Sequence, residues 1–321
     1  MNASNPHRQE LVVVTGASTG IGAATARELA RRGFHVLAGV RRDVDAEALR
    51  TDGIEPHILD ITVESDVVAI ADRVARDPLR RPVRALINNA GISINAPVET
   101  LPIAEWRRLF EVNLLGHVAM TQALLPALLR SRGTVVNISS VGGKLAMATY
   151  GPYAGTKFAL EAVSDALRRE VAELGIKVVV IEPGAVQTEM GERGLATTDR
   201  LSAGMTPAQL QRYGDLTAAI SAQARSHLKT GVTAEHAAKV IAKAATASRP
   251  RTRYAVGRDA AILVRLARVI SDRLLDRILR LGLRPHYVKN SQSSARRSDP
   301  SISVRGASLW GSPRRRVDAL S

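Results

Sequence analysis

The feature that most constrains the fold is a regular alternation of short aliphatic runs with longer helical patterns. Strands are predicted at 11–14, 35–39, 58–59, 85–88, 134–138, 176–182 and 253–256. Helices are predicted at 20–32, 64–76, 102–130, 153–174 and 234–247, the last with Thr233 as its N-cap. Strands that alternate with helices are joined by right-handed crossovers, which produce a parallel sheet. We therefore expect one α/β domain, a doubly wound Rossmann fold of about seven parallel strands with helices on both faces.

Composition agrees with this architecture and excludes some chemistry. Aromatic residues make up only 3% of the chain, so the core must be aliphatic, as in buried parallel sheets. The chain has no cysteine, which excludes disulfides, thiolate nucleophiles and cysteine-ligated metals, and we assign no metal site. The first ten residues are polar, and no uninterrupted apolar run approaches the ~18 residues of a membrane span. We therefore expect a cytoplasmic protein.

Positive charge is concentrated near the C-terminus. The net charge is +15, and residues 249–321 hold 17 Lys and Arg against 5 Asp and Glu, which accounts for 12 of it. The first 248 residues carry only +3, so the domain body gives little reason to expect nucleic-acid binding.

The predicted domain covers residues 8–289, and two of its segments have distinct expected roles. Residues 189–230 follow the sixth strand and contain four glycines, so we expect a substrate lid of short mobile helices. Residues 259–283 are predicted as a C-terminal amphipathic helix, and residues 290–321 as a disordered basic tail.

The apolar stripe of that C-terminal helix has two interpretations. It consists of Ile262, Leu266, Ile270, Leu274, Ile278 and Leu281. A globular domain routinely buries such a stripe against its body, which is the favoured interpretation. Alternatively, the helix lies on an anionic membrane and makes weak, peripheral contact with it.

A glycine-rich turn follows the first strand and opens the first helix. It reads Thr15-Gly16-Ala17-Ser18-Thr19-Gly20-Ile21-Gly22. Glycines let the backbone approach a pyrophosphate closely, and a helix N-terminus offers N–H groups to the anion. The motif indicates a dinucleotide site, although an ordinary strand-to-helix turn would have a similar pattern.

Tyr153 and Lys157 lie four residues apart in a predicted helix and so share one face. An ammonium beside a phenol favours the phenolate and lowers its pKa from about 10. A tyrosine tuned in this way can exchange a proton with an alcohol or ketone. None of the other four tyrosines is followed by lysine at this spacing.

Polar residues end two of the predicted central strands. Ser139 and Ser140 follow the fifth strand, where ligands of such sheets bind, but they point to opposite faces. Asn89 follows the fourth strand, and Asn113 lies inside an otherwise apolar helix. Structural hydrogen bonding explains both asparagines equally well on local grounds.

Taken together, these motifs resemble the short-chain dehydrogenase/reductase family, in its compact branch. The resemblance covers 10–287 and rests on T-G-A-S-T-G-I-G, N-N-A-G, N-I-S-S, Y-A-G-T-K and P-G-A-V-Q-T in family order. It implies Tyr153 as general acid/base, Lys157 as its tuning partner, Ser140 rather than Ser139 as substrate ligand, and Asn113 in a water-linked proton relay.

The resemblance also implies the cofactor-contact positions. They are Gly16, Ser18, Thr19, Gly20, Ile21, Gly22, Arg41, Asp60, Ile61, Asn89, Ala90, Gly91, Tyr153, Lys157, Pro183, Gly184, Val186 and Thr188. NADP(H) is favoured over NAD(H), because Val40 stands where NAD-preferring relatives have an acidic residue and Arg41 can pair with a 2′-phosphate.

The expected activity is hydride transfer between a nicotinamide cofactor and a lipophilic alcohol, ketone or aldehyde. Residues 167–171 and 180–184 resemble the hydroxysteroid and retinol dehydrogenase side of the family. Alternatives are a 3-oxoacyl-carrier-protein reductase and a redox fold that serves as a basic nucleic-acid or membrane-surface binding module. A homodimer or homotetramer is expected, without nucleic acid as a partner.

Overall fold

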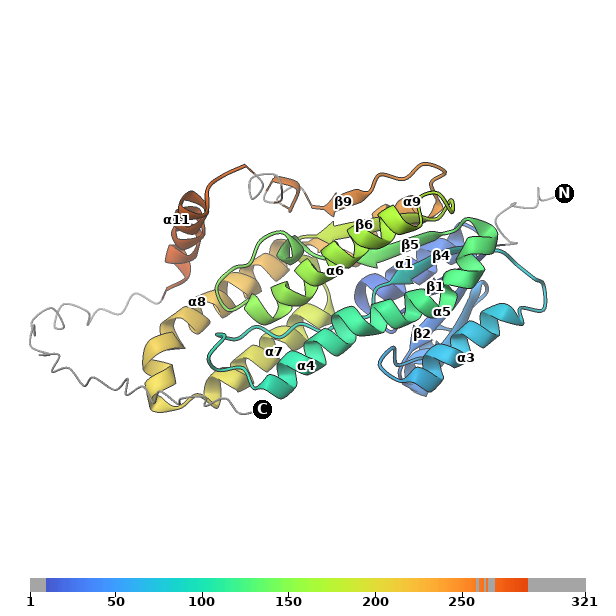
Figure 1. Ribbon diagram of the computed structural model, residues 1–321. Helices are drawn as coiled ribbons and strands as arrows, with labels where there is room; N and C mark the ends of the chain where they lie inside the picture. Colours follow the sequence, from blue (N-terminus) through green and yellow to red (C-terminus); the bar gives the residue numbers. More distant parts are fainter. Residues whose placement is uncertain (1–9, 258–259, 263, 265–268, 288–321) are drawn as a thin grey trace, which may run out of the picture. The chain divides into compact units, whose positions relative to one another are not determined.

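Seven parallel strands form one sheet in the order β3-β2-β1-β4-β5-β6-β9 (Figure 1). In this computed structural model, residues 10–257, 260–262, 264 and 269–287 are described. The strands are β1 Leu11–Val14, β2 His35–Val40, β3 Ile54–Ile58, β4 Val83–Asn88, β5 Thr134–Ile138, β6 Lys177–Pro183 and β9 Arg253–Val256. Strand order reverses between β1 and β4, which is where ligands bind in doubly wound folds. The predicted seven-stranded Rossmann fold is confirmed.

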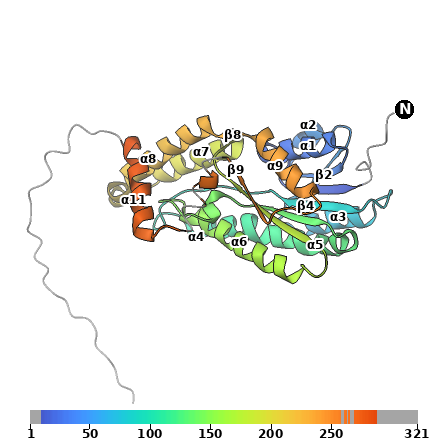
Figure 2. The same cartoon turned by 90° about the horizontal axis from the view of Figure 1, so that it is seen from above.

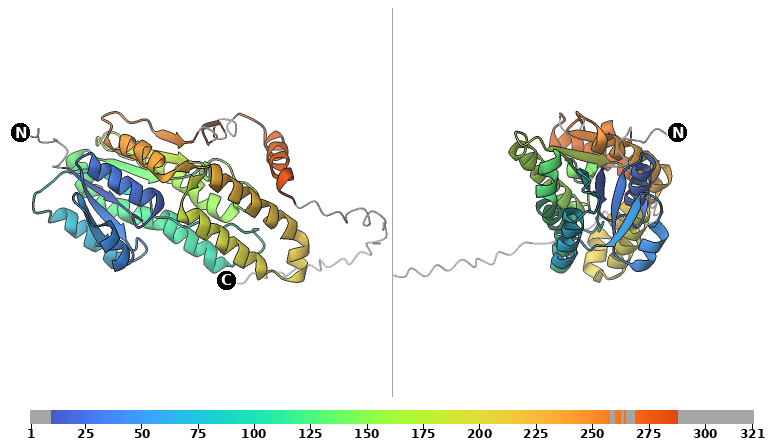
Figure 3. Two further views of the ribbon diagram at one scale, coloured as in Figure 1. Left: turned by 180° about the vertical axis from the view of Figure 1, so that it is seen from behind. Right: turned by 90° about the vertical axis from the view of Figure 1, so that its right-hand side faces the viewer.

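Helices cover both faces of this sheet (Figures 2 and 3). One face packs against α1 Gly20–Arg31, α2 Asp43–Leu49 and α9 Ala234–Thr246. The other packs against α3 Glu64–Ala75, α5 Gly116–Ser131 and α6 Gly151–Glu170. As predicted, Thr233 caps α9, its hydroxyl accepting from the His236 amide at 3.2 Å.

The two cores are divided by the two-residue period of the strands. In β1, Val12 and Val14 belong to the core under α1 and α9, whereas Leu11 and Val13 belong to the core under α3 and α5. All four side chains are fully buried. A strand buried on both faces has no polar position, which is why β1 is a continuous aliphatic run.

The long helical run predicted at 102–130 changes its hydrogen-bond period near the middle. It comprises α4 Ile103–Phe110, a π-helical turn Glu111–Leu115 and α5. By length and composition this run could cross a membrane, although a core helix of a globular domain passes the same test. Within α5, Met120, Leu124 and Leu128 are buried in the core against the sheet.

Two elements near the sheet edge differ from the sequence prediction. The third strand begins at Ile54, earlier than the predicted run at 58–59, and contains Pro56. Proline is tolerated because β3 lies at the edge of the sheet, where its missing N–H costs no ladder hydrogen bond. The short helix α2 was not predicted, because its seven residues are too few for a clear helical period.

The segment after β6 is more regular than the short mobile helices that we expected. It forms a short strand β7 Val186–Gln187, then α7 Glu189–Ala203 and α8 Pro207–Thr230, and pairs again through β8 Val232–Thr233. A capping box fixes the start of α8, because Thr206 and Gln209 bond each other's backbone N–H groups.

The C-terminal helix predicted at 259–283 is interrupted, because residues 260–262 and 264 are helical but the helix is broken before α11. Val269 and Ile270 form a turn and a bend, and helix α11 covers only Asp272–Leu283, followed by a 3₁₀ turn η4 at Arg284–His286. The predicted tail at 290–321 lies outside the described residues.

Candidate active site

Loops from four neighbouring strands meet at one edge of the sheet. The glycine-rich turn follows β1, the Asn89–Gly91 segment follows β4, the two serines follow β5, and the segment 183–188 includes the end of β6. Since all four strands are parallel, their carboxyl ends lie together, and this edge is where such sheets bind ligands.

Ser140, Tyr153 and Lys157 converge beside a 3₁₀ turn, η3 Val141–Gly143. The Tyr153 hydroxyl forms a hydrogen bond with Ser140, whose Oγ also accepts from the Gly142 amide at 3.0 Å. The Lys157 Nζ lies 5.8 Å from the centre of the Tyr153 ring and donates to the Ile138 carbonyl at 2.9 Å. The three residues that the sequence singled out therefore form one cluster.

Ser139 points to a different part of the site. Its side chain is buried, and among the described residues its Oγ has no hydrogen-bond partner. A Cβ added at Gly143 would lie 2.6 Å from this Oγ and 3.1 Å from Cγ of Glu161, whereas one at Gly142 would lie near Ser140 and the Tyr153 ring. Ser139 thus faces Glu161, and only Ser140 faces the tyrosine.

The pKa values in this cluster do not follow the simple expectation from the Tyr-Lys spacing. Burial raises the pKa of Tyr153 to about 12, and the Ser140 hydrogen bond only partly opposes the shift. Burial likewise lowers the pKa of Lys157 to about 8, partly opposed by Glu161. The expected lowering of the tyrosine pKa is therefore absent from the protein chain itself, because burial of the phenol raises its pKa by more than the Ser140 hydrogen bond lowers it.

Asn113 lies in the π-helical turn and uses its whole amide group for structure. Its Nδ2 donates to the Ile92 carbonyl at 2.9 Å and to Thr156 Oγ1 at 3.1 Å, and its Oδ1 accepts from the Ile92 amide at 2.9 Å. The residue is fully buried. Asn113 therefore connects the loop after β4 to Thr156 of α6, which lies three residues after Tyr153. These contacts agree with the structural interpretation of this asparagine.

The glycine-rich turn has the shape of an anion cradle. Gly16 has a φ of +63° and packs so closely on the next loop that a Cβ would lie 2.6 Å from Cα of Ala90. At Gly22 a Cβ would lie 2.2 Å from the Gly16 carbonyl oxygen. Asn89 holds the turn, donating from Nδ2 to the carbonyls of Thr15 and Gly16 at 3.0 Å each. The N-cap residue Thr19 makes no side-chain hydrogen bond to the first turn of α1, so these residues fit a dinucleotide pyrophosphate.

The remaining cofactor positions divide between exposed and structural surroundings. Ser18, Thr19, Gly20 and Thr188 line a cavity of about 890 Å³ between the turn and the helices α7, α8 and α9. Ile21 is partly buried against the core beneath α1. Ile61, Pro183 and Val186 are buried, Gly91 packs near Asn113, and Gly184 donates to the Val256 carbonyl at 3.0 Å.

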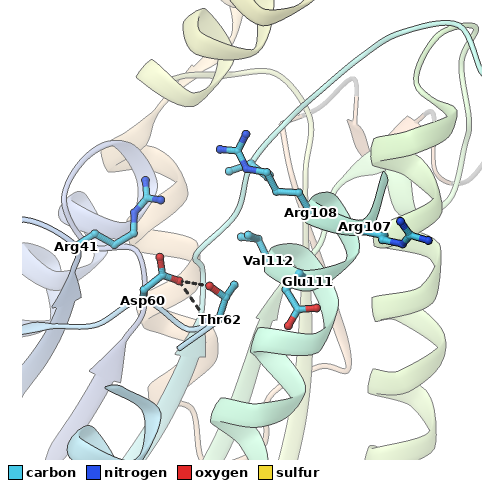
Figure 4. A pocket seen from close by; sticks show the side chains of 8 residues that line it. Arg41, Asp60, Thr62, Arg107, Arg108, Glu111 and Val112 are labelled. Carbon is cyan, nitrogen blue, oxygen red and sulfur yellow. Dashed lines mark hydrogen bonds between the residues drawn. The ribbon is translucent and has the colours of Figure 1, made fainter. Parts of the chain in front are cut away.

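A second cavity of about 370 Å³, called here the arginine cavity, lies at the other end of this edge (Figure 4). Its lining residues are Arg41, Asp60, Thr62, Ile92, Arg107, Arg108, Glu111 and Val112. Figure 4 shows Arg41 and Arg108 on opposite sides of the cavity. Asp60 is oriented by the Thr62 hydroxyl and amide, at 2.7 and 3.0 Å. Arg42 is not part of the cavity, because Asp45 holds its guanidinium at 2.6 and 2.7 Å.

Sequence reasoning found Arg41 and Asp60 but missed the opposite wall. Arg108 and Val112 are four residues apart and so share one face of the helical run that leads to Asn113. That spacing was the available signal, but only the tertiary fold places α4 across from the end of β2.

Comparisons with known proteins agree with this geometry. The short chain dehydrogenase family profile matches residues 10–198. Human retinol dehydrogenase 16 is 36% identical over 264 residues, which are 80% of this chain and 83% of that protein. The chain belongs to the short-chain dehydrogenase/reductase family. It is an oxidoreductase, on the side of the family near the retinol and hydroxysteroid dehydrogenases.

Two further proteins are also similar to this chain. An NADPH-dependent 3-dehydrocapnine reductase from Ornithobacterium rhinotracheale is 32% identical, over 83% of this chain and 94% of that protein. A crystal structure of a short-chain dehydrogenase from Streptomyces avermitilis has a TM-score of 0.67 and 30% identity, and covers 89% of this chain and 97% of that one. The likeness extends well beyond the matched profile, which ends at residue 198.

Proposed function

We propose that the protein interconverts an alcohol and a ketone or aldehyde on a lipophilic substrate, with a nicotinamide cofactor and with Tyr153 as general acid/base. The observation that carries the proposal is the cluster of Ser140, Tyr153 and Lys157 at the edge of the sheet that also holds the glycine cradle. The retinol dehydrogenases among the relatives support a lipophilic substrate.

Each residue of the cluster has a distinct task in this reaction. Ser140 and Tyr153 donate hydrogen bonds to the substrate carbonyl, which polarises its carbon for reduction. A bound nicotinamide supplies or accepts the hydride. In reduction Tyr153 gives its hydroxyl proton to the substrate oxygen, and in oxidation it takes the alcohol proton. The Lys157 ammonium favours the resulting phenolate, because the two charges attract within a buried site.

Asn113 is proposed as a positioning residue. Its amide is fully engaged with Ile92 and Thr156, so the side chain has no donor left for a proton relay. It holds the loop after β4 at a fixed distance from α6, which fixes the position of Tyr153 relative to the glycine-rich turn.

NADP(H) is the proposed cofactor, and Arg41 and Arg108 are proposed to bind its 2′-phosphate from the two sides of the arginine cavity. Three observations support this. Val40 offers no carboxylate to a free ribose hydroxyl, Arg41 and Arg108 face one cavity, and one relative is named as NADPH-dependent. Guanidinium groups bind phosphate through charge-assisted hydrogen bonds. NAD(H) would leave both arginines without this anion.

A homodimer or homotetramer is proposed for the assembled enzyme. Leu115 and Phe158 support a self-contact, because these apolar side chains, at the end of the π-helical turn Glu111–Leu115 and in α6, are 50% and 45% exposed. Light scattering after size exclusion tests this, and a monomer at micromolar concentration would contradict it.

The reaction is tested by following nicotinamide absorbance with retinal, ketosteroids and an acetoacetyl thioester as substrates. Tyr153→Phe should lose nearly all turnover and keep cofactor affinity, because only the hydroxyl is removed. Tyr254→Phe is the matched control, since its hydroxyl accepts from the Arg251 amide outside the site. A preference for the thioester would favour the carrier-protein reductase alternative, and full activity of Tyr153→Phe would refute the mechanism.

A further inference from the structure

Helix α11 has three parallel rows of side chains, and only one of them packs on the domain. That row is Leu275, Leu279 and Leu283. Leu283 is 7% exposed and lies in an apolar cluster with Ala219 and Ile220 of α8. The Gly282 carbonyl also accepts from Gln223 Nε2 of α8, at 3.3 Å. This row packs α11 against α8.

The second row is apolar and exposed. Leu274, Ile278 and Leu281 follow the three- and four-residue spacing of one helix face, and they are 46%, 40% and 55% exposed. Burial of this stripe against the domain, the favoured expectation from the sequence, is therefore wrong for these residues. Leucine and isoleucine in water lose the free energy that burial would provide, so a contiguous row of them indicates a partner.

The third row consists of arginines. These arginines follow the same three- and four-residue spacing and are exposed, and their row lies beside the exposed apolar row: Arg273, Arg277, Arg280 and Arg284. Among the described residues, no carboxylate forms an ion pair with Arg273, Arg277 or Arg284. Asp272 and Asp276 lie instead on the side of Leu279 and Leu283, by helical spacing. The side of α11 turned away from the body thus has an apolar stripe beside a cationic one.

We propose that this side of α11 lies on the surface of an anionic phospholipid membrane. The apolar row would enter the boundary between headgroups and acyl chains, and the arginine row would meet the lipid phosphates. The positive charge of this side favours a lipid surface over a second copy of the chain as its partner. A symmetric contact of α11 with itself would bring two arginine rows together, and they would repel each other.

The position of α11 gives this contact a consequence for catalysis, which rests on the proposed function. Leu283 shares its apolar cluster with Tyr150, three residues before Tyr153. The membrane contact therefore lies next to the substrate side of the active site, where a lipophilic substrate could pass from lipid into the enzyme.

Sedimentation of the full chain with vesicles tests the membrane contact without any activity measurement. We expect binding to vesicles of phosphatidylcholine with phosphatidylserine, weaker binding at high salt, and little binding to phosphatidylcholine alone. Leu274→Ser with Ile278→Ser should weaken binding by about tenfold or more, and Arg273→Gln with Arg277→Gln by a similar factor. All four positions are exposed, so the variants should fold, which circular dichroism verifies.

Control variants remove comparable side chains elsewhere. Val44→Ser and Leu79→Ser remove apolar groups that are 66% and 71% exposed on the far part of the domain, and should bind vesicles as the unmodified chain does. Unchanged binding after loss of the apolar row would assign the attraction to other basic residues and overturn the proposal. So would a monomer–dimer shift caused by these substitutions in the absence of lipid. An inactive enzyme that binds vesicles as expected would contradict the proposed function and leave this inference standing.

Discussion

Replacement of Arg108 by alanine is expected to weaken recognition of a 2′-phosphate while leaving the fold intact. The side chain is 59% exposed, and its ion pair with Glu105 spans 3.5 Å, so its contribution to stability is small. Exposed pairs of this kind are worth about 0–1 kcal/mol, and we expect no detectable change in unfolding temperature. The effect should therefore fall on ligand binding alone.

The size of the binding effect follows from the chemistry of the lost contact. A hydrogen bond to a charged group contributes about 1.5–3 kcal/mol. Because the arginine cavity is open to water, the lower half of this range applies, which corresponds to a rise in Kd of roughly ten- to fortyfold. Arg41→Ala should have a similar effect, since Arg41 lines the opposite side of the same cavity.

Calorimetric titration with adenosine 2′,5′-bisphosphate and with 5′-AMP separates the 2′-phosphate from the rest of the nucleotide. Arg108→Ala should weaken only the bisphosphate. Arg42→Ala is the matched control, because it removes the same charge next to Arg41 from a guanidinium already held by Asp45. Bisphosphate affinity within threefold of the unmodified protein would refute the role of Arg108. Equal affinity of the unmodified protein for both nucleotides would instead refute the NADP(H) preference.

Three further predictions concern the catalytic serine, acid stability and the lid. Ser140→Ala should lose at least about tenfold in kcat and Ser139→Ala much less, because only Ser140 bonds Tyr153; the reverse ranking in steady-state kinetics would contradict the site. Hydrogen bonds from Arg73, and more weakly from His35 and His57, lower the pKa of Glu55 from 4.5 to about 2. The ionised Glu55 therefore stabilises the folded state above pH 4.5, and this contribution is lost as the pH falls toward 2. Urea unfolding should show Glu55→Gln less stable by about 1–2 kcal/mol at pH 7, with a difference that shrinks below pH 4.5; a gap independent of pH would argue against this ion pair. Limited proteolysis should cut between residues 189 and 230, and less with cofactor and substrate bound, if α7 and α8 close over the site; equal cutting in both states would speak against a lid.

The parts of the fold that were predictable from sequence are those fixed by local chemistry. The aliphatic run of β1 and the glycines after it have no good alternative to a buried strand and a tight turn. The Tyr-Lys spacing likewise determines a shared helix face without knowledge of the fold. Elements whose form depends on sheet position escaped prediction: β3 tolerates Pro56 only because it lies at the edge.

Contacts between distant segments account for the remaining differences. Nothing local indicates that Arg108 lies across a cavity from Arg41, since 67 positions separate them and α4 and β2 meet only in the folded domain. The pKa of Tyr153 was misjudged for a related reason, because its burial depends on packing and not on the nearby lysine. The helix breaks before α11 at Val269 and Ile270. Nothing in the sequence indicated this break, because Ile270 continues the helical spacing of the predicted apolar stripe.

The π-helical turn Glu111–Leu115 sets the rotational phase between the two halves of one continuous helical run. A wider turn inserts one extra residue, and each residue of an α-helix turns the chain by about 100°. Upstream of the turn, Arg108 faces the arginine cavity, and downstream of it, Leu124 faces the sheet. Deletion of a single residue here would leave α5 seated in the core and swing α4 about its axis, so that Arg108 would leave the cavity wall. The proposed recognition of the 2′-phosphate would thus depend on helical phase as well as on residue identity.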